Sequence, residues 1–333
     1  MLEKNSAREY GFDEDFLQAN PRSSRHPENS KTTHPEEQTD DFITDSAIKW
    51  MQKNKEKSFF LNYWPRSVSA PYHAKPELIE KYNALANFNN KQYRPIYAAM
   101  IEAMDANIGK LLDALDQLDI ADKTAIIFFS TNGGVTSDTE KCDGAAPTSN
   151  SPLRGGASSV YEGGLAVPCI VSWPNVTKFN SRSHAVIQGA DFYPTFVSLL
   201  GLETKPGQIF DGVSIVRALT GKPLERQAVF THFPHYPRLL SSGDPDALPP
   251  CSQVIAGEWK LIRIYHEEGE GKHGYRLHNL RDDVTETHNF SAENPGKVAE
   301  LDALIQQHLD NTKAVIPEIN PEYRPSMKSV DAD

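Results

Sequence analysis

The amino-acid sequence predicts an α/β fold made of one large domain and a small antiparallel subdomain. A long amphipathic helix leads into a continuous β-branched and aromatic run, Thr124–Ser130, and a glycine turn follows directly. After about residue 220, short strand-like runs alternate with turn residues. We therefore expect a loop or arm over residues 1–40, an α/β domain over 41–220, and a subdomain with a small sheet and a terminal helix over 221–333.

The composition is that of an acidic protein with enough residues for a proper core. The 333 residues include 34 basic and 45 acidic side chains, for a net charge of −11. Proteins that bind nucleic acid or anionic membranes neutralise phosphates with clustered Lys and Arg. No basic stripe occurs in the sequence, so we expect neither partner.

Cysteine usage and apolar run length exclude further classes. Cys142, Cys169 and Cys251 lie far apart and without C-x-x-C spacing, which argues against a disulfide scaffold and a structural zinc site; Cys169 is expected to fill core. The longest apolar runs are far shorter than the roughly 20 residues of a membrane span. Met1 is followed at once by charged residues, with no signal peptide. If Met1 is the true start, we expect a cytoplasmic product.

The first elements of the α/β domain follow the polar arm. Thr44 or Asp45 can cap a helix, and a β-rich run, Ser58–Tyr63, indicates a buried strand. Helices are predicted at Pro76–Leu85 and Pro95–Leu118. The apolar stripe of the second helix indicates core packing, and its members are Tyr97, Met100, Ile101, Met104, Ile108, Leu111, Leu112, Leu115 and Leu118.

The middle of the chain contains the segment expected to carry function. The run Thr124–Ser130 suits a strand that is covered on both faces. Residues 131–166 are rich in Gly, Ser and Thr, and loops of that length are usually functional or disordered. A strand at Val167–Trp173 and a helix at Asp191–Leu200, ended by Gly201, complete the predicted domain.

The C-terminal part is predicted to be a small antiparallel sheet with a terminal helix. Four runs have strand composition and turn signals between them: Ala228–His232, Ser252–Ile255, Trp259–Tyr265 and Tyr275–Leu280. The helix at Pro295–Leu309 places Val298, Leu301, Ile305 and Leu309 on one face.

Two loops after predicted strands contain residues suited to anion or cation chemistry. The Asn132 amide oxygen can bind a hard cation, although Asn-Gly also marks an ordinary turn. Arg154 can hold an anionic ester through its two-pronged guanidinium, or it is simply an exposed loop charge. His232 and His235 can donate to an anion or transfer protons near neutral pH, or they are packed at a strand end.

A set of short motifs in these loops has a distinctive order and spacing. Its members are Ser130–Gly134, Leu153–Gly156, Tyr161–Gly164, Val167–Pro168 and Trp173–Pro174. Together they resemble the formylglycine-dependent sulfatases of the alkaline-phosphatase superfamily. Further similar segments are Gly11–Asp13, Phe59–Leu61, Val68–Pro71, Asp191–Thr195, His232–Tyr236, Trp259–Ile262 and Leu277–Leu280.

The resemblance implies a fold and a reaction. The fold is a mixed sheet sandwiched by helices, and the reaction is hydrolysis of sulfate esters. A Cys or Ser in C/S-x-P-x-R becomes formylglycine, whose hydrate attacks sulfur while Ca²⁺ holds the ester. Neither the cysteines nor the serines of this chain lie in that motif. The family's amino-terminal stretch, with the nucleophile and paired metal aspartates, would precede residue 10, so we expect a truncated chain.

Other family positions are altered as well. The aspartate of D-N-G-G is Thr131, the histidine of V-H-x-P is Ser69, and the lysine of L-R-G-G-K is Ala157. Asn132 alone is unchanged among these positions. A set of Asn132 and Thr131 is poor for Ca²⁺, which takes 6–8 oxygen ligands. We therefore expect weak or absent metal binding, no formylglycine, and no intact catalytic residue.

The combined expectation is a degenerate sulfatase-family protein whose partner is a sulfated carbohydrate or another sulfate ester. Removal of single electrostatic or acid–base groups costs about 10²–10⁴ in rate, so we expect inactivity or strong impairment. One alternative is a non-catalytic binder that presents Arg154, His232, His235 and Lys260 to the anion. Another is that a different chain or an upstream start supplies the missing segment. Loss of a central strand also predicts self-association.

Overall fold

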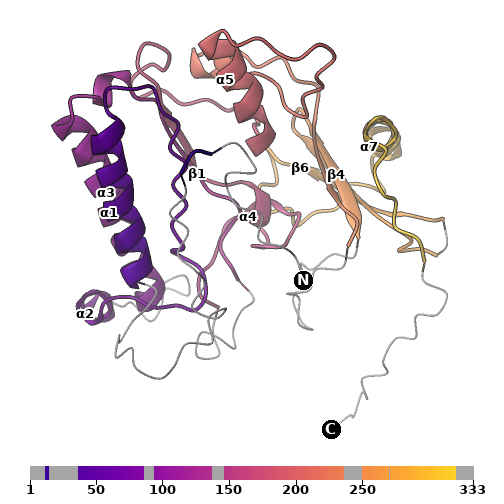
Figure 1. Cartoon of the computed structure of the whole chain (residues 1–333). Coiled ribbons are helices and arrows are strands. Elements are labelled where there is room, and N and C mark those ends of the chain that lie inside the picture. The colour runs from indigo at the N-terminus through magenta and orange to yellow at the C-terminus, as the bar shows by residue number, and fades with distance from the viewer. Residues whose placement is uncertain are drawn as a thin grey trace. The chain divides into compact units, whose positions relative to one another are not determined.

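The computed structural model describes residues 12–14, 37–85, 94–136, 146–235, 250–269 and 271–319 (Figure 1). The chain divides into two compact units. The first contains residues 1–125 and 138–148, and the second contains 126–137 and 149–333. The chain therefore passes from one unit to the other at Ala125, at Ser137 and at Thr148, and residue 220, the predicted boundary, lies inside the second unit.

The first unit is helical in its described part. Helices α1 (Glu37–Asn54) and α2 (Pro76–Ala84) both pack on α3 (Pro95–Gln117). α1 begins inside the predicted arm over residues 1–40, several residues before the predicted cap. Thr44 is buried, and its hydroxyl donates to the carbonyl of Asp40 one turn earlier, so it is an interior residue of the helix.

The buried stripe of α3 is narrower than its sequence predicts. Met100 and Leu115 are buried as expected, whereas Ile101 and Leu112 are more than two-fifths exposed. α1 and α2 both contact α3 but leave part of its predicted stripe exposed. The helix also buries Ala99, Asn107 and Ala114, which are small or polar.

The predicted strand Ser58–Tyr63 is wrong: the structure assigns no strand to these residues. Side chains nevertheless alternate as in a strand, since Phe59 packs edge-on against Trp50 while Phe60 is 63% exposed. The Tyr63 hydroxyl bonds that of Thr44 at 2.9 Å. High β-propensity sets an extended backbone, but a strand also needs a neighbouring strand for its hydrogen bonds.

The second unit begins with a two-stranded ribbon. β1 (Ile126–Phe129) pairs antiparallel with β2 (Cys169–Ser172), in a register that joins Ile126 to Ser172. β1 is half-buried rather than covered on both faces, and Cys169 is half-buried rather than in the core. The first feature contradicts the expectation of a strand covered on both faces, and the second contradicts that of a core cysteine. Among the described residues β1 has one neighbouring strand, β2.

Short helices follow the ribbon in the same unit. α4 (Glu162–Leu165) lies inside the stretch predicted as loop, and η3 (Gly189–Asp191) leads into α5 (Phe192–Leu200). Gly201 ends α5 with φ of +61°, in agreement with its predicted role. α6 (Val216–Leu219) precedes the C-terminal sheet.

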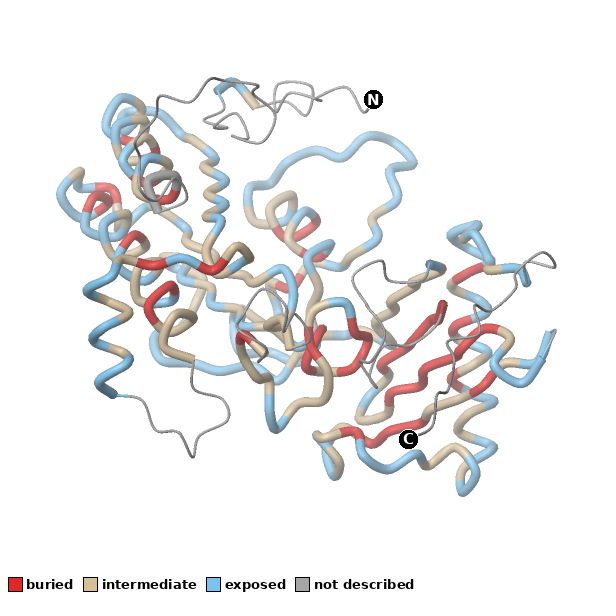
Figure 2. The backbone as a smooth tube through the Cα atoms, turned by 90° about the horizontal axis from the view of Figure 1, so that it is seen from below, coloured by how far each residue is buried: buried red, intermediate tan, exposed pale blue. Residues whose placement is uncertain are grey.

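The C-terminal sheet and helix confirm the sequence prediction. β3 (Val229–Phe233), β4 (Cys251–Ala256), β5 (Trp259–Ile264) and β6 (Gly274–Asn279) form an antiparallel sheet in chain order. In Figure 2 this sheet carries much of the buried backbone of the unit. Helix α7 (Pro295–Thr312) packs on β4 and β5.

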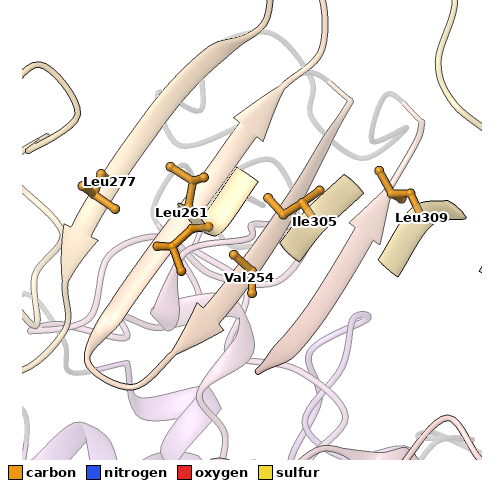
Figure 3. Packing of buried hydrophobic residues seen from close by; sticks show 6 residues of the cluster. Val254, Leu261, Leu277, Ile305 and Leu309 are labelled. Carbon is orange, nitrogen blue, oxygen red and sulfur yellow. The ribbon is translucent and has the colours of Figure 1, made fainter. Parts of the chain in front are cut away.

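One face of this sheet forms an apolar core with α7. Figure 3 shows the side chains that meet there: Val254, Leu261, Leu277, Ile305 and Leu309. Ile305 and Leu309 are four residues apart, which places them on one face of the helix as predicted. The other face buries Ile262 and Ile264 against a segment that includes Tyr161. None of the helices in the described ranges is long and apolar enough to cross a membrane.

Candidate functional site

Backbone hydrogen bonds join two glycine-rich segments after β1, residues 131–134 and 150–164. We call this hydrogen-bonded junction the glycine knot, a name for the hydrogen bonds and not for a chain threaded through itself. The N–H of Gly133 donates to the carbonyl of Gly164 at 3.0 Å, and the N–H of Ala157 donates to that of Gly134 at 3.0 Å. The Asn150 side chain accepts from the Gly134 N–H at 3.0 Å and donates back to the Gly134 carbonyl at 2.9 Å. These bonds tie the Asn132 turn to the 150–164 loop, so two loops that the sequence singles out separately are joined in one local structure.

Glycine is required in the knot because the backbones approach closely. A Cβ at Gly133 would lie 1.7 Å from the carbonyl oxygen of Gly163. A Cβ at Gly163 would lie 2.4 Å from the carbonyl oxygens of both Arg154 and Gly155. Both clashes involve backbone atoms, so a side chain at either position would force the loops apart.

Thr131 and Asn132 are exposed at the edge of the knot and bond to each other. The Thr131 hydroxyl donates to the Asn132 Oδ1 at 2.9 Å, and the Asn132 Nδ2 donates to the Gly133 carbonyl at 2.8 Å. Within the ranges that the structure describes, no three His, Cys, Asp or Glu residues are grouped to hold a metal. One amide and one hydroxyl fall far short of the roughly 6–8 oxygen ligands that Ca²⁺ takes, so Thr131 and Asn132 by themselves do not fit that ion.

Arg154 is half-buried and held in place by the C-terminal part of its own unit. Its guanidinium carbon lies 3.9 Å from the centroid of the Tyr161 ring, a cation–π contact. Its Nη1 donates to the carbonyl of Glu286 at 2.9 Å. The side chain thus has a fixed orientation, which is a requirement for two-pronged recognition of an anion.

Lys260 occupies a different environment from the one predicted for a substrate-binding cation. It is fully buried on β5, with its Nζ 2.9 Å from Glu162 Oε1 and 2.8 Å from Glu286 Oε1. The Lys260 ammonium group therefore forms ion pairs with two carboxylates of the protein. Burial raises the pKa of Glu286, and the charge of Lys260 opposes that change.

His278 lies beside Lys260 in the sheet and is also buried. Its Nδ1 lies 2.8 Å from the His288 carbonyl, an arrangement in which Nδ1–H donates. Its Nε2 is buried, with no hydrogen-bond partner among the described residues. Burial lowers the pKa of His278 to about 4, and the nearby charges of Lys260 and Arg154 act in the same direction. The imidazole is therefore neutral at pH 7.

His232 on β3 and His235 just after it have contacts of their own in the C-terminal part of the second unit. His232 has Nδ1 2.7 Å from the Ser252 hydroxyl and Nε2 2.9 Å from the carbonyl of Val315, so both nitrogens have protein partners. His235 is exposed and stacks edge-on with Phe233. The packed alternative considered for His232 therefore describes it better than a free acid–base group.

Ser69 lies in the first unit, where it lines a cleft of about 270 Å³. The same cleft includes His73, Lys75, Asp41 and Lys110. Burial acts to raise the pKa of Asp41, but hydrogen bonding to Lys110 and the charge of Lys75 outweigh it, and the pKa lies below its ordinary value. Asp41 therefore stays ionised between the two lysines.

The residues singled out from the sequence and those that the structure brings together overlap in part. Thr131, Asn132, Arg154 and Ala157 belong to one structure within the second unit. The partners Tyr161, Glu162, His278 and Glu286 are given no role from the sequence, although all but Glu286 stand in segments singled out there. Glu286 had no local signal, because its importance comes from residues more than twenty positions away.

Comparison with known proteins places the chain in a family. The family model Sulfatase matches residues 1–202, and N-sulphoglucosamine sulphohydrolase, C-terminal, matches residues 158–314. A sulfatase of Formosa agariphila is 30% identical over 77% of this chain and 46% of its own length. An N-acetylgalactosamine-6-O-sulfatase of Bacteroides thetaiotaomicron is 26% identical, over 80% and 50%. The chain spans about half the length of the curated relatives it matches.

Solved structures confirm the α/β fold. Ps i-CgsB in complex with k-i-k-neocarrahexaose is 25% identical, with a TM-score of 0.65 over 84% of this chain and 57% of that one. BT4656 in complex with its substrate D-glucosamine-2-N,6-O-disulfate is 18% identical, with a TM-score of 0.63 over 82% and 70%. The helices with antiparallel sheets described above agree with this fold, and the chain belongs to the sulfatase family.

Proposed function

We propose that this protein recognises sulfate esters of carbohydrates, and that hydrolysis of such esters is the activity of its lineage. Family membership over nearly the whole chain supports this proposal. Relatives whose names specify sulfated sugars support the substrate class. The fixed guanidinium of Arg154 supplies a suitable donor for an anionic ester.

We further propose that these 333 residues alone do not hydrolyse the ester. The observation behind this proposal is that no cysteine or serine of the chain lies in a C/S-x-P-x-R motif. Neutral side chains at Thr131 and Ala157 remove further charge from the site that the family resemblance implies. Each missing electrostatic group costs about 10²–10³ in rate, and loss of the nucleophile costs more.

The test measures hydrolysis and binding on the same purified chain. Incubation with 4-nitrophenyl sulfate, N-acetylgalactosamine 6-sulfate or D-glucosamine-2-N,6-O-disulfate, with and without Ca²⁺, is expected to release no sulfate above the buffer rate. Calorimetry is expected to show binding of at least one sulfated sugar and none of its unsulfated counterpart. Turnover that disappears in Asn132→Ala would overturn the proposed inactivity.

A matched pair of arginine variants tests where the ester binds. Arg154→Ala is expected to weaken binding about tenfold or more, because a charge-assisted hydrogen-bond pair is lost. Arg281→Ala removes an exposed arginine that pairs with Glu258 and is expected to leave affinity unchanged. Equal affinity of both variants and the parent chain would refute the role of Arg154.

A further inference from the structure

A closed network of buried charges connects the C-terminal sheet to the 150–164 loop. Lys260 lies on β5, Glu162 begins α4, and Glu286 follows β6. The Lys260 Nζ lies within 2.9 Å of an oxygen of each carboxylate. Lys260 and Glu286 are completely buried, and the Glu162 side chain is only 16% exposed. Buried charges are retained only with such partners, because the desolvation of an unpaired charge is costly.

Glu286 holds the loop through its backbone as well as through charge. Its Oε2 accepts the N–H of Glu162 at 2.6 Å, and its carbonyl accepts from Arg154 Nη1 at 2.9 Å. Glu286 itself has φ of +51°, a left-handed backbone conformation that non-glycine residues rarely adopt. Such a conformation persists only where the surroundings determine it, and it clusters at functional sites.

The contacts form a continuous path to the glycine knot. Lys260 and Glu286 fix Glu162, which is followed by Gly163, whose N–H donates to the carbonyl of Arg154 at 2.7 Å. Gly164 then accepts from Gly133, next to Asn132. The position of Arg154 is therefore set from two sides by residues that the C-terminal sheet anchors.

From this geometry we propose that Lys260 and Glu286 are positioning residues. They hold Glu162, and thereby fix the loop in the conformation that presents Arg154 to the sulfate ester. The last step rests on the proposed function, whereas the holding of the loop does not. The assignment replaces the sequence-based expectation that Lys260 contacts the ester directly, since its Nζ is fully buried between two carboxylates.

Hydrogen exchange measured on the full 333-residue chain tests the holding of the loop. Lys260→Met leaves two buried carboxylates facing each other, and exchange in peptides covering 150–166 is expected to accelerate roughly hundredfold. Glu286→Gln keeps one carboxylate paired with Lys260, so this variant should fold even if Lys260→Met does not. It is expected to accelerate hydrogen exchange in the same peptides about tenfold. Peptides from α7 should change less than about twofold in both.

The control is Lys222→Met, which removes an exposed lysine after α6 and is expected to leave all exchange rates unchanged. Unchanged exchange in 150–166 for both Lys260→Met and Glu286→Gln would overturn the proposal. Equal acceleration throughout the second unit would also overturn it, because that result indicates general destabilisation rather than positioning.

Binding of N-acetylgalactosamine 6-sulfate and D-glucosamine-2-N,6-O-disulfate to the same variants tests the functional step. Lys260→Met is expected to weaken binding of the sugar. The double variant with Arg154→Ala is expected to bind only slightly more weakly than Lys260→Met alone, because Arg154 is already displaced. Additive losses with unchanged loop exchange would show direct contact between Lys260 and the sugar, and would overturn the proposal. If the parent chain binds neither sugar while loop exchange accelerates, the proposed function fails and the loop assignment stands.

Discussion

Acidification from pH 6.5 to pH 4 is expected to destabilise the second unit through His278. Burial lowers the pKa of this imidazole in the folded protein from its ordinary 6.5 to about 4. The unfolded chain therefore takes up a proton over this range while the folded protein resists it, so stability is lost as the pH falls. At 1.36 kcal/mol per pKa unit, the full loss is about 3 kcal/mol, of which about 2 kcal/mol is lost by pH 5.

Urea unfolding at a series of pH values measures this loss, with His278→Asn as the control. The Asn amide can still donate to the His288 carbonyl but has no proton to gain. Other groups also titrate in this range: burial lowers the pKa of His273 and His308, whereas burial raises that of Glu286. These contributions are common to both proteins and cancel in the difference. Identical pH dependence of the two proteins would refute the reasoning.

Three further outcomes are expected. Leu261→Ala, in the core between the sheet and α7, should lower the free energy of unfolding measured in urea by about 2–5 kcal/mol. The control Ile209→Ala, at a side chain that is 89% exposed, should change it by less than about 0.5 kcal/mol. Gly163→Ala should lower the free energy of unfolding by about 1–3 kcal/mol, because the new Cβ overlaps backbone carbonyl oxygens. Gly109→Ala, in open space on α3, should raise it by up to about 1 kcal/mol. If Gly109→Ala is the more destabilising of the two, the close approach at Gly163 is contradicted. Added Ca²⁺ should shift Tm by less than about 1 °C, and a rise of several degrees would reveal a site beyond Asn132.

The parts of the fold that the sequence predicts correctly are those fixed by local patterns. The apolar residues of α7 repeat every three to four positions, and the strands of the C-terminal sheet alternate with turns along the chain. Each strand of that sheet pairs with its neighbour in sequence, so local composition is sufficient. The segment Ser58–Tyr63 has equally strong strand composition but no assigned partner, and strand formation depends on residues distant in sequence.

The same distinction applies to the site. Asn132 and Arg154 stand next to glycines in recognisable motifs, so their place in the 131–164 region can be predicted. The burial of Lys260 cannot, because Glu162 is 98 residues away and Glu286 follows a separate strand. A lysine in a strand is usually exposed, and only the three-dimensional structure shows that two carboxylates pair with Lys260.

The glycine knot separates the shape of the loop from its chemistry. Its path is set by backbone contacts at Gly133 and Gly163, whereas Thr131 and Ala157 contribute side chains that the path does not need. Chemistry can therefore be lost or restored one side chain at a time while the scaffold stays intact. Ala157→Lys is a direct way to ask how much anion affinity such a preserved loop can regain, and Thr131→Asp asks the same question of Ca²⁺ affinity.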